Sequence, residues 1–299
     1  MPARLPFDAA IDEYRKQAIE LLDGWKNGDA GWTQIARRTH PRFLNPEIRW
    51  LPLDLSDAEI RGAAFEPSDA ELALARWYDF EGWPRLEEYA DAVARKDSPA
   101  YRFESAVEAV IDGDVDALAS LIRTDADLIR RRSERVTPFD PPRHRATLLH
   151  YIAANGVEGY RQKTPANALE IARMLLDAGA EVDALADVYG GQHTTMSMLV
   201  SSNPPAAAGL QVPLAELLLD HGAAIEGRGS GAWTPPLMTA LAFGFGDTAD
   251  ALVRRGARVD NVAAAAGLGR LADVRRLLPA AELFQPIVPF DHHITAIPF

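Results

Sequence analysis

The sequence predicts an all-α protein organised as a helical solenoid, in which repeated helix pairs follow one another along the chain. Three segments end with nearly the same residues, and they recur at intervals of a few tens of residues. Within these segments the apolar residues follow the helical period of about 3.6 residues, not the alternation of a strand. Such short units cannot bury their apolar faces alone, so they must stack on one another.

The repeated endings define the length of the unit. Each consists of two apolar residues, two variable residues and Gly-Ala, and an apolar–acidic pair follows two residues later. Gly222 lies 43 residues after Gly179, and Gly256 lies 34 residues after Gly222, so the period is in the low thirties with one enlarged unit. The endings are Leu175–Ala180, Leu218–Ala223 and Leu252–Ala257, and the pairs are Val182-Asp183, Ile225-Glu226 and Val259-Asp260.

Each unit contains signals for two short helices. Residues 169–176 place most of their apolar side chains on one broad helical face, and Gly179 is expected to end that helix in a left-handed conformation. Upstream, Thr147 is a suitable N-cap for a helix of about two turns that stops at Gly156. The unit is therefore a pair of antiparallel helices.

With these residues in view, the sequence resembles the ankyrin-repeat family, whose units read roughly T-P-L-H-x-A-A-x-x-G, then a second helix ending L-L-x-x-G-A, then a hairpin-like finger. Residues 147–156 match the first half, with His150 at the position of the family's histidine. The resemblance covers about five units over residues 99–281, and it implies that His150 joins neighbouring repeats through hydrogen bonds. The third unit, which begins at Thr194, has Ser197 at the histidine position.

Outside the repeats, residues 1–98 are expected to form an α-helical N-terminal capping region. Residues 27–29 resemble the Gly-Asp turn at 112–114, so one degenerate repeat here is an alternative. The stretch 69–86 resembles the segment ahead of the repeats in bacterial ankyrin-repeat proteins. Its aromatic residues Trp77, Tyr78, Phe80 and Trp83 are expected to form core, with a ligand-stacking box as the alternative. Residues 282–299 form an apolar C-terminal tail that we expect to fold over the last repeat or to precede further repeats.

Composition and charge exclude several classes of protein. With 31 Lys and Arg against 43 Asp and Glu, the net charge of −12 argues against a nucleic-acid partner. The absence of cysteine excludes disulfides and thiolate metal sites, and His292-His293 lack a spaced third ligand, so no metal is expected. No signal peptide or membrane-spanning stretch is recognisable, which favours a cytoplasmic protein. Phosphate loops, nucleophile elbows and zinc-protease motifs are also missing, so we expect no cofactor and can assign no catalytic residue.

Two insertions separate this chain from a plain repeat array. They lie between the two helices of the second unit, at 157–168, and of the third unit, at 204–211. Since the same turn is enlarged in consecutive units, the loops are expected to emerge side by side on the edge opposite the fingers. Insertions in solenoids often map to a binding face. The alternative is tolerated variation in loop length.

The resemblance implies that a protein partner binds the concave side, which is lined by first helices and fingers. Six residues occupy outward first-helix positions in the alignment and are candidate contacts: Tyr151, Asn155, Met198, Ser202, Thr239 and Phe243. A second set could hold a small anionic ligand, because the first finger carries a basic run that includes Arg135 and ends near a histidine. Its members are Arg131, Arg132, Arg143, His144, Tyr189 and His193. A solvated basic surface is the alternative.

The leading functional prediction is a protein–protein interaction module. An enzyme or small-ligand receptor with a pocket between fingers and insertions is the first alternative. A homo-oligomeric scaffold is the second. A deep cavity lined by His144, His193 and Tyr189 would favour the enzyme or receptor, whereas an open groove would favour a macromolecular partner.

Overall fold

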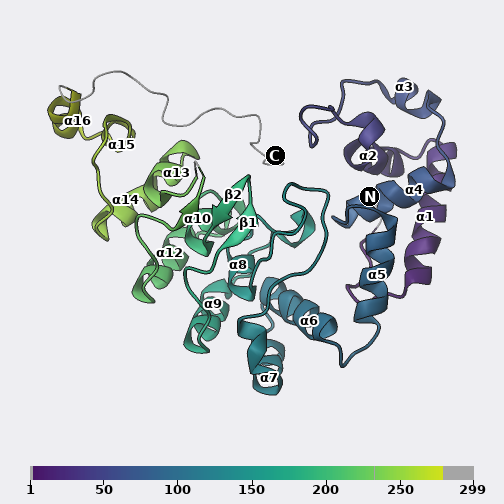
Figure 1. The fold of residues 1–299 in the computed structure, drawn as a ribbon. Coiled ribbons are helices and arrows are strands. Elements are labelled where there is room, and N and C mark those ends of the chain that lie inside the picture. The colour runs from purple at the N-terminus through teal and green to yellow at the C-terminus, as the bar shows by residue number, and fades with distance from the viewer. Residues whose placement is uncertain (1–2, 232, 279–299) are drawn as a thin grey trace. The chain divides into compact units, whose positions relative to one another are not determined.

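The computed structural model describes residues 3–231 and 233–278, which form two compact units (Figure 1). Unit 1 contains residues 3–105 and 134–143, and unit 2 contains residues 106–133, 144–231 and 233–278. Over the described ranges the secondary structure comprises sixteen α-helices, three 3-10 helices and three very short strands. The predicted helical class is therefore confirmed. The division falls inside α6 (Pro99–Asp112), and residues 134–143 also belong to unit 1, while the predicted tail 282–299 lies outside the described residues.

Unit 1 is a cluster of helices around α4 (Pro67–Trp77). This helix packs against three others, which are α1 (Ile11–Lys26), α2 (Ala30–Thr39) and α5 (Trp83–Val93). The shorter elements are η1 (Pro41–Phe43) and α3 (Asp57–Gly62). Helix starts follow the sequence signals: the Asp29 carboxylate accepts a hydrogen bond from the Trp32 amide, and Ser56 forms a capping box with Glu59.

The core of unit 1 is rich in aromatic side chains. The Trp25 ring stacks on Phe65, with ring centroids 4.2 Å apart, and on Phe43 at 5.6 Å. Tyr78 and Phe80 are buried in this core, and Trp77 and Trp83 pack against it as partly buried side chains. The predicted core role is confirmed for Tyr78 and Phe80, while Trp77 and Trp83 lie at the edge of this core.

Unit 2 contains four consecutive helix pairs, coloured from teal to yellow in Figure 1. The first helix contacts the second helix within each pair. First helices of neighbouring pairs also contact one another, as do the second helices of the first three pairs. This pattern is what short amphipathic helices need in order to bury their apolar faces. The pairs are α8 (Leu148–Ile152) with α9 (Ala168–Asp177), α10 (Thr195–Leu199) with α12 (Gln211–Asp220), α13 (Pro236–Ala242) with α14 (Gly246–Arg254), and α15 (Val262–Gly267) with α16 (Leu271–Leu277).

The remaining elements of unit 2 connect or precede these pairs. They are α7 (Val115–Thr124), η2 (Ala126–Ile129), η3 (Gly159–Arg161) and α11 (Asn203–Ala207).

Glycine ends the second helix of three pairs, as the sequence predicts. Gly179, Gly222 and Gly256 have φ angles of 93°, 87° and 104°, in the left-handed region that glycine adopts without a steric penalty. The amide of the alanine that follows each glycine donates to the carbonyl five residues back, at 3.0 Å in all three cases. This is the Schellman pattern of helix termination.

The apolar–acidic pairs join one repeat to the next. Both carboxylate oxygens of Asp183 accept from the Ala224 amide at 3.1 Å, and Glu226 accepts from the Arg258 amide at 2.9 Å. The acidic residue of one repeat thus satisfies a backbone N–H of the following repeat, which explains why an acid recurs at this position.

Three short strands pair in the order β1–β2–β3 with antiparallel registers. They are β1 (Ala186–Val188), β2 (Gly191–His193) and β3 (Gly229–Ser230). A Cβ atom at Gly191 would lie 2.2 Å from the Ser230 carbonyl oxygen, so β2 and β3 can approach this closely only with glycine there.

Candidate functional site

His150 is a structural residue in unit 2. Its Nδ1 accepts from the Thr147 amide at 3.1 Å, so Nε2 carries the proton and donates to the Ala184 carbonyl at 3.1 Å. The ring is fully buried, and desolvation lowers its pKa from 6.5 to about 3. A neutral imidazole with both nitrogens engaged ties α8 to the following finger and has no free nitrogen for proton transfer.

Four of the six predicted partner contacts are not outward-facing. Tyr151, Met198, Ser202 and Thr239 are at most 2% exposed, so the prediction of outward side chains is wrong for them. Other parts of unit 2 cover these four side chains, and backbone carbonyls accept hydrogen bonds from two of them. The Ser202 hydroxyl donates to the Ala154 carbonyl at 3.1 Å, and the Thr239 hydroxyl donates to the Trp233 carbonyl at 3.2 Å.

The other two predicted contacts are partly exposed. The Asn155 amide nitrogen donates to the Met198 carbonyl at 3.1 Å and to the Ser201 hydroxyl at 2.9 Å, and its oxygen accepts from Tyr189. Asn155 therefore links the first and second of the four helix pairs. Phe243 lies at the end of α13, and its ring meets that of Trp233 edge to face at 5.2 Å.

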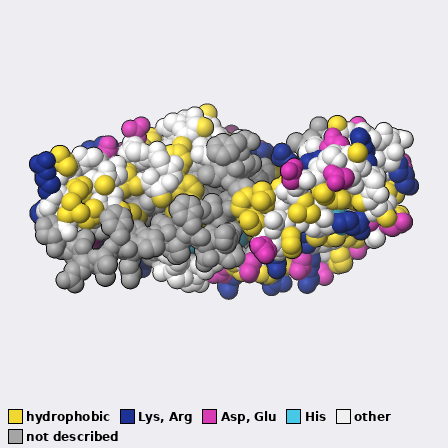
Figure 2. Space-filling model, turned by 90° about the horizontal axis from the view of Figure 1, so that it is seen from above, with side chains coloured by type: hydrophobic (Ala, Val, Ile, Leu, Met, Phe, Trp, Pro, Cys, Tyr) yellow, Lys and Arg dark blue, Asp and Glu magenta, His cyan; other side chains and the backbone are white. Residues whose placement is uncertain are grey.

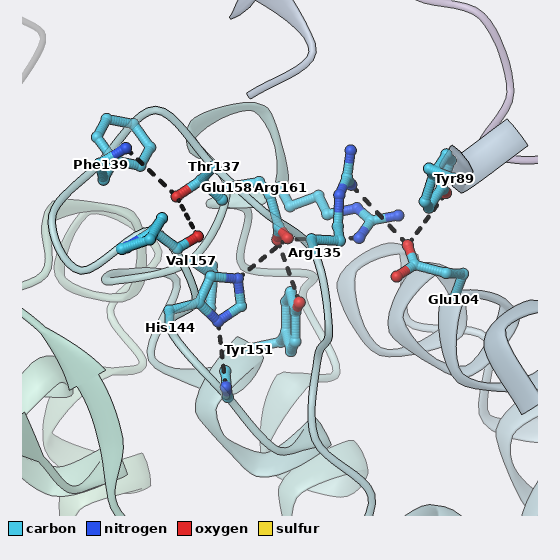
Figure 3. A network of polar contacts seen from close by, with 12 residues as sticks. Tyr89, Glu104, Arg135, Thr137, Phe139, His144, Tyr151, Val157, Glu158 and Arg161 are labelled. Atoms are coloured by element: carbon cyan, nitrogen blue, oxygen red, sulfur yellow. Dashed lines mark hydrogen bonds and ion pairs between the residues drawn. The ribbon is translucent and has the colours of Figure 1, made fainter. Parts of the chain in front are cut away.

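The first insertion contains two fully buried charged residues, Glu158 and Arg161 (Figure 3). The prediction that residues 157–168 form a loop projecting from the array is wrong for this part of the segment. We refer to Glu158, Arg161, His144, Tyr151 and Glu108 as the Glu158 cluster. It joins the insertion to the finger through His144, to α8 through Tyr151 and to α6 through Glu108.

Two hydrogen bonds orient the Glu158 carboxylate. Oε1 lies 3.1 Å from His144 Nε2, and Oε2 accepts from the Tyr151 hydroxyl at 3.1 Å. His144 Nδ1 accepts from the Ala146 amide at 3.1 Å, so Nε2 is the protonated nitrogen and donates to Glu158. Since both imidazole nitrogens are engaged, His144 positions the finger and is not arranged as a general base.

The Arg161 guanidinium balances the charge of this cluster. Its Nε and Nη2 contact Glu108 Oε1 at 3.1 and 2.9 Å, and Nη1 lies 3.8 Å from Glu158 Oε2. One buried cation thus stands between two carboxylates. A buried charge without a partner costs several kcal/mol, about 3 to 5 in measured cases, so Glu158 and Arg161 must be retained together. Sequence reasoning missed both, although their i, i+3 spacing inside an insertion was an available signal.

The second insertion is also tied into unit 2. Residues 203–207 form α11, and Gln211 at the start of α12 is buried. Its amide nitrogen donates to the carbonyls of Leu199 and Ser202 at 2.9 and 3.1 Å, while its oxygen accepts from the Thr248 hydroxyl at 2.6 Å. Both insertions therefore support the packing of helix pairs.

The predicted anionic-ligand residues do not form one site. Arg131 pairs with Asp125 at 3.0 Å, Arg132 donates to the Arg145 carbonyl at 2.9 Å, and His144 belongs to the Glu158 cluster. Arg143 is exposed and belongs to the segment of unit 1 at 134–143. Only Tyr189 and His193 lie together, with rings edge to face at 6.2 Å.

Arg135, in the middle of the basic run, is buried within unit 1. Its guanidinium carbon lies 4.1 Å from the Phe80 ring centroid and 4.7 Å from that of Tyr89, and Nη1 is 3.9 Å from Glu104. The basic run is therefore divided between internal contacts and surface, and it does not act as one anion-binding group.

Charges and metal-ligand residues are dispersed. Among the side chains that Figure 2 colours by type, Lys and Arg are interspersed with Asp and Glu. Among residues 3–231 and 233–278, no three His, Asp or Glu side chains come together as a metal-ligand set, and His292-His293 lie beyond these ranges. None of the helices in the described ranges combines the length and apolarity needed to cross a bilayer.

In comparisons with known proteins, no family model matches this chain and no curated protein is significantly similar to it. The resemblance to ankyrin repeats therefore depends on the repeated residues described above.

Proposed function

We propose that unit 2 is an ankyrin-type helical solenoid that binds a protein partner in the cytoplasm. Three features support this proposal. The helix pairs contact their neighbours in chain order, glycines end the second helices in phase, and His150 and Asp183 bond across successive repeats. All three follow from stacking short units that cannot fold alone.

The proposed contact surface is the aromatic pair formed by Trp233 and Phe243, and this is the observation that carries the proposal. Both side chains are partly exposed, and they come from the finger and the first helix of the same repeat. Aromatic side chains that keep exposed area next to a firm backbone are typical anchors of protein interfaces. The Thr239–Trp233 hydrogen bond fixes the finger on α13, so the pair is preorganised for binding.

The surface around this pair supports a protein partner more than a polyanion. Residues 226–231 of the finger are largely exposed. Within the finger, Arg228 pairs with Asp183 at 3.2 Å, and farther along the chain Arg258 pairs with Glu226 at 3.4 Å. Because these guanidinium groups already face carboxylates, a nucleic acid would gain little from them.

Affinity capture with three forms of the full chain tests this proposal. The wild type is compared with the double variant Trp233→Ala/Phe243→Ala and with Ile19→Ala, a control that removes a 61% exposed hydrophobic side chain from unit 1. Proteins captured by the wild type and by Ile19→Ala, but lost with the double variant, would support the proposal. Isothermal titration calorimetry with the captured protein would then measure how much affinity the double variant has lost.

Capture of the same proteins in equal amounts by all three forms would contradict the proposed contact surface. Far-UV circular dichroism of each form establishes that the helices remain folded. A protein recovered only by the wild type, and lost with the Ile19→Ala control as well, would also argue against the Trp233–Phe243 pair.

A further inference from the structure

Residues 3–7 of unit 1 lie against α1 and α4 without helical or strand structure of their own. Backbone groups at three positions of this segment bond to side chains of α1 and of the residue after α4. The Gln17 amide nitrogen donates to the Ala3 carbonyl at 3.0 Å, and the Leu5 amide donates to the Tyr78 hydroxyl at 2.8 Å. The Tyr14 hydroxyl donates to the Pro6 carbonyl at 3.5 Å.

One side chain of the segment occupies a separate aromatic position. The Arg4 guanidinium carbon lies 4.5 Å from the Trp77 ring centroid and 5.3 Å from that of Tyr78. Its Nη1 also donates to the Trp77 carbonyl, at the last residue of α4. Ring faces and the carbonyls of a helix C-terminus both attract cations, so this position suits a guanidinium group.

The receiving side chains are also held by contacts with one another. Tyr78 is 2% exposed, its hydroxyl donates to Gln17 Oε1 at 2.8 Å, and its ring meets that of Tyr14 edge to face at 5.1 Å. Gln17 is 6% exposed. Preorganised polar groups of this kind raise affinity because little conformational entropy is lost on binding.

Space for a longer ligand lies next to the segment. A shallow depression of about 150 Å³ is lined by Leu5 and Gln17 together with three charged residues of α1, which are Glu13, Lys16 and Glu20. Glu13 and Glu20 are exposed and outnumber the exposed Lys16, so the lining of this depression carries a net negative charge.

We propose that Gln17, Trp77 and Tyr78 form a binding site for arginine-containing peptide segments, which residues 3–7 occupy in cis. Backbone hydrogen bonds at three of the five residues, together with one anchored side chain, are the kind of contacts that a bound linear peptide makes. A peptide with arginine followed by an apolar residue and proline would repeat the contacts of Arg4, Leu5 and Pro6. This site is separate from the proposed partner surface on unit 2, so either can be disproved without the other.

Fluorescence anisotropy with an acetylated, fluorescein-labelled peptide Ala-Arg-Leu-Pro-Phe tests the site in the full chain. The variant Arg4→Ala should bind this peptide about tenfold more tightly than the wild type, because the competing segment loses its cation–π contact and a hydrogen bond. The peptide Ala-Ala-Leu-Pro-Phe should bind Arg4→Ala about tenfold more weakly than the arginine peptide, for the same reason. The control Arg15→Ala removes an exposed arginine of α1 and should behave as the wild type.

Equal binding of the two peptides to Arg4→Ala, or no saturable binding of either, would overturn the proposal. Both peptides are compared on one folded variant, so loss of structure cannot imitate the result. Light scattering of the wild type then distinguishes the source of the peptide. A concentration-dependent dimer that Arg4→Ala abolishes would identify a second copy of this chain as that source.

Discussion

The hydroxyl of Tyr151 donates a hydrogen bond to the carboxylate of Glu158 at 3.1 Å, and both side chains are fully buried. Tyr151 lies on α8 and Glu158 belongs to the first insertion, so this bond fixes an added segment onto a repeat helix. Tyr151, which the ankyrin alignment places on the partner-binding surface, is therefore an interior residue. The first insertion is therefore packed against α8 and belongs to the interior of unit 2.

The Tyr151→Phe substitution should lower the free energy of unfolding by about 1 to 2 kcal/mol, because the buried Glu158 oxygen loses one donor. Glu158→Ala should lower the free energy of unfolding further, by about 3 kcal/mol, because the Arg161 guanidinium and the His144 imidazole both lose the Glu158 carboxylate. Urea unfolding followed by far-UV circular dichroism measures both. A Glu158→Ala variant as stable as the wild type would show that the Glu158 cluster does not contribute to folding.

Arg161→Met should destabilise the protein by about 3 to 5 kcal/mol, because Glu108 and Glu158 lose the cation between them. Lys163→Met is the matched control: Lys163 pairs with Asp112 at 3.6 Å, but both side chains are more than half exposed. The control should change stability by less than about 1 kcal/mol. The same urea titration compares the two variants, and equal effects would contradict a specific role for burial.

Stability should rise between pH 3 and pH 6.5 because of His150. Its pKa is about 3 in the folded protein against 6.5 as the ordinary value, so the unfolded chain binds more protons in this window. One such group contributes a slope of up to about 1.4 kcal/mol per pH unit. Desolvation also lowers the pKa values of His40 and His193, which act in the same direction.

The variant His150→Gln should therefore show a shallower rise of stability with pH than the wild type. Chemical unfolding at several pH values from 4 to 8 gives the two slopes. If the wild type and His150→Gln gave the same slope of stability against pH over the whole range, His150 would not stay neutral in the folded protein.

Asp183→Ala should reduce stability by about 1 to 3 kcal/mol, because the Ala224 amide of the next repeat loses its acceptor. Asp183→Asn should cost less, since the amide oxygen still accepts one bond. Asp177→Ala is a suitable control, as this carboxylate is 67% exposed and lies 3.4 Å from His221. Thermal unfolding ranks the three variants, and a control as damaging as Asp183→Ala would refute the proposed link between repeats.

Local signals in the sequence predicted much of the secondary structure. Gly179, Gly222 and Gly256 end helices where the repeat required it, because only a residue without a side chain adopts positive φ at low cost. His150 forms the bonds expected of its position, because Thr147 and the next finger lie at fixed distances along the repeat. The aromatic residues of unit 1 are core, as their size predicted.

The candidate site was harder to predict, because exposure depends on which distant segment covers a residue. Met198 and Ser202 occupy outward positions in a plain repeat, yet Asn155 and the Ala154 carbonyl of the preceding repeat engage this part of the chain. Likewise, nothing in the sequence around Arg4 indicates Trp77, which lies 73 residues away.

The sequence by itself determined the helical class, the length of the repeat and the residues that end its helices, because these depend on backbone conformation and on spacing within a few turns. Only the tertiary structure decided which charged and aromatic side chains are surface and which are interior. Glu158 and Arg161 illustrate the physical reason. Two opposite charges can enter an interior only when folding brings them together with Glu108, His144 and Tyr151, and local sequence does not encode that meeting.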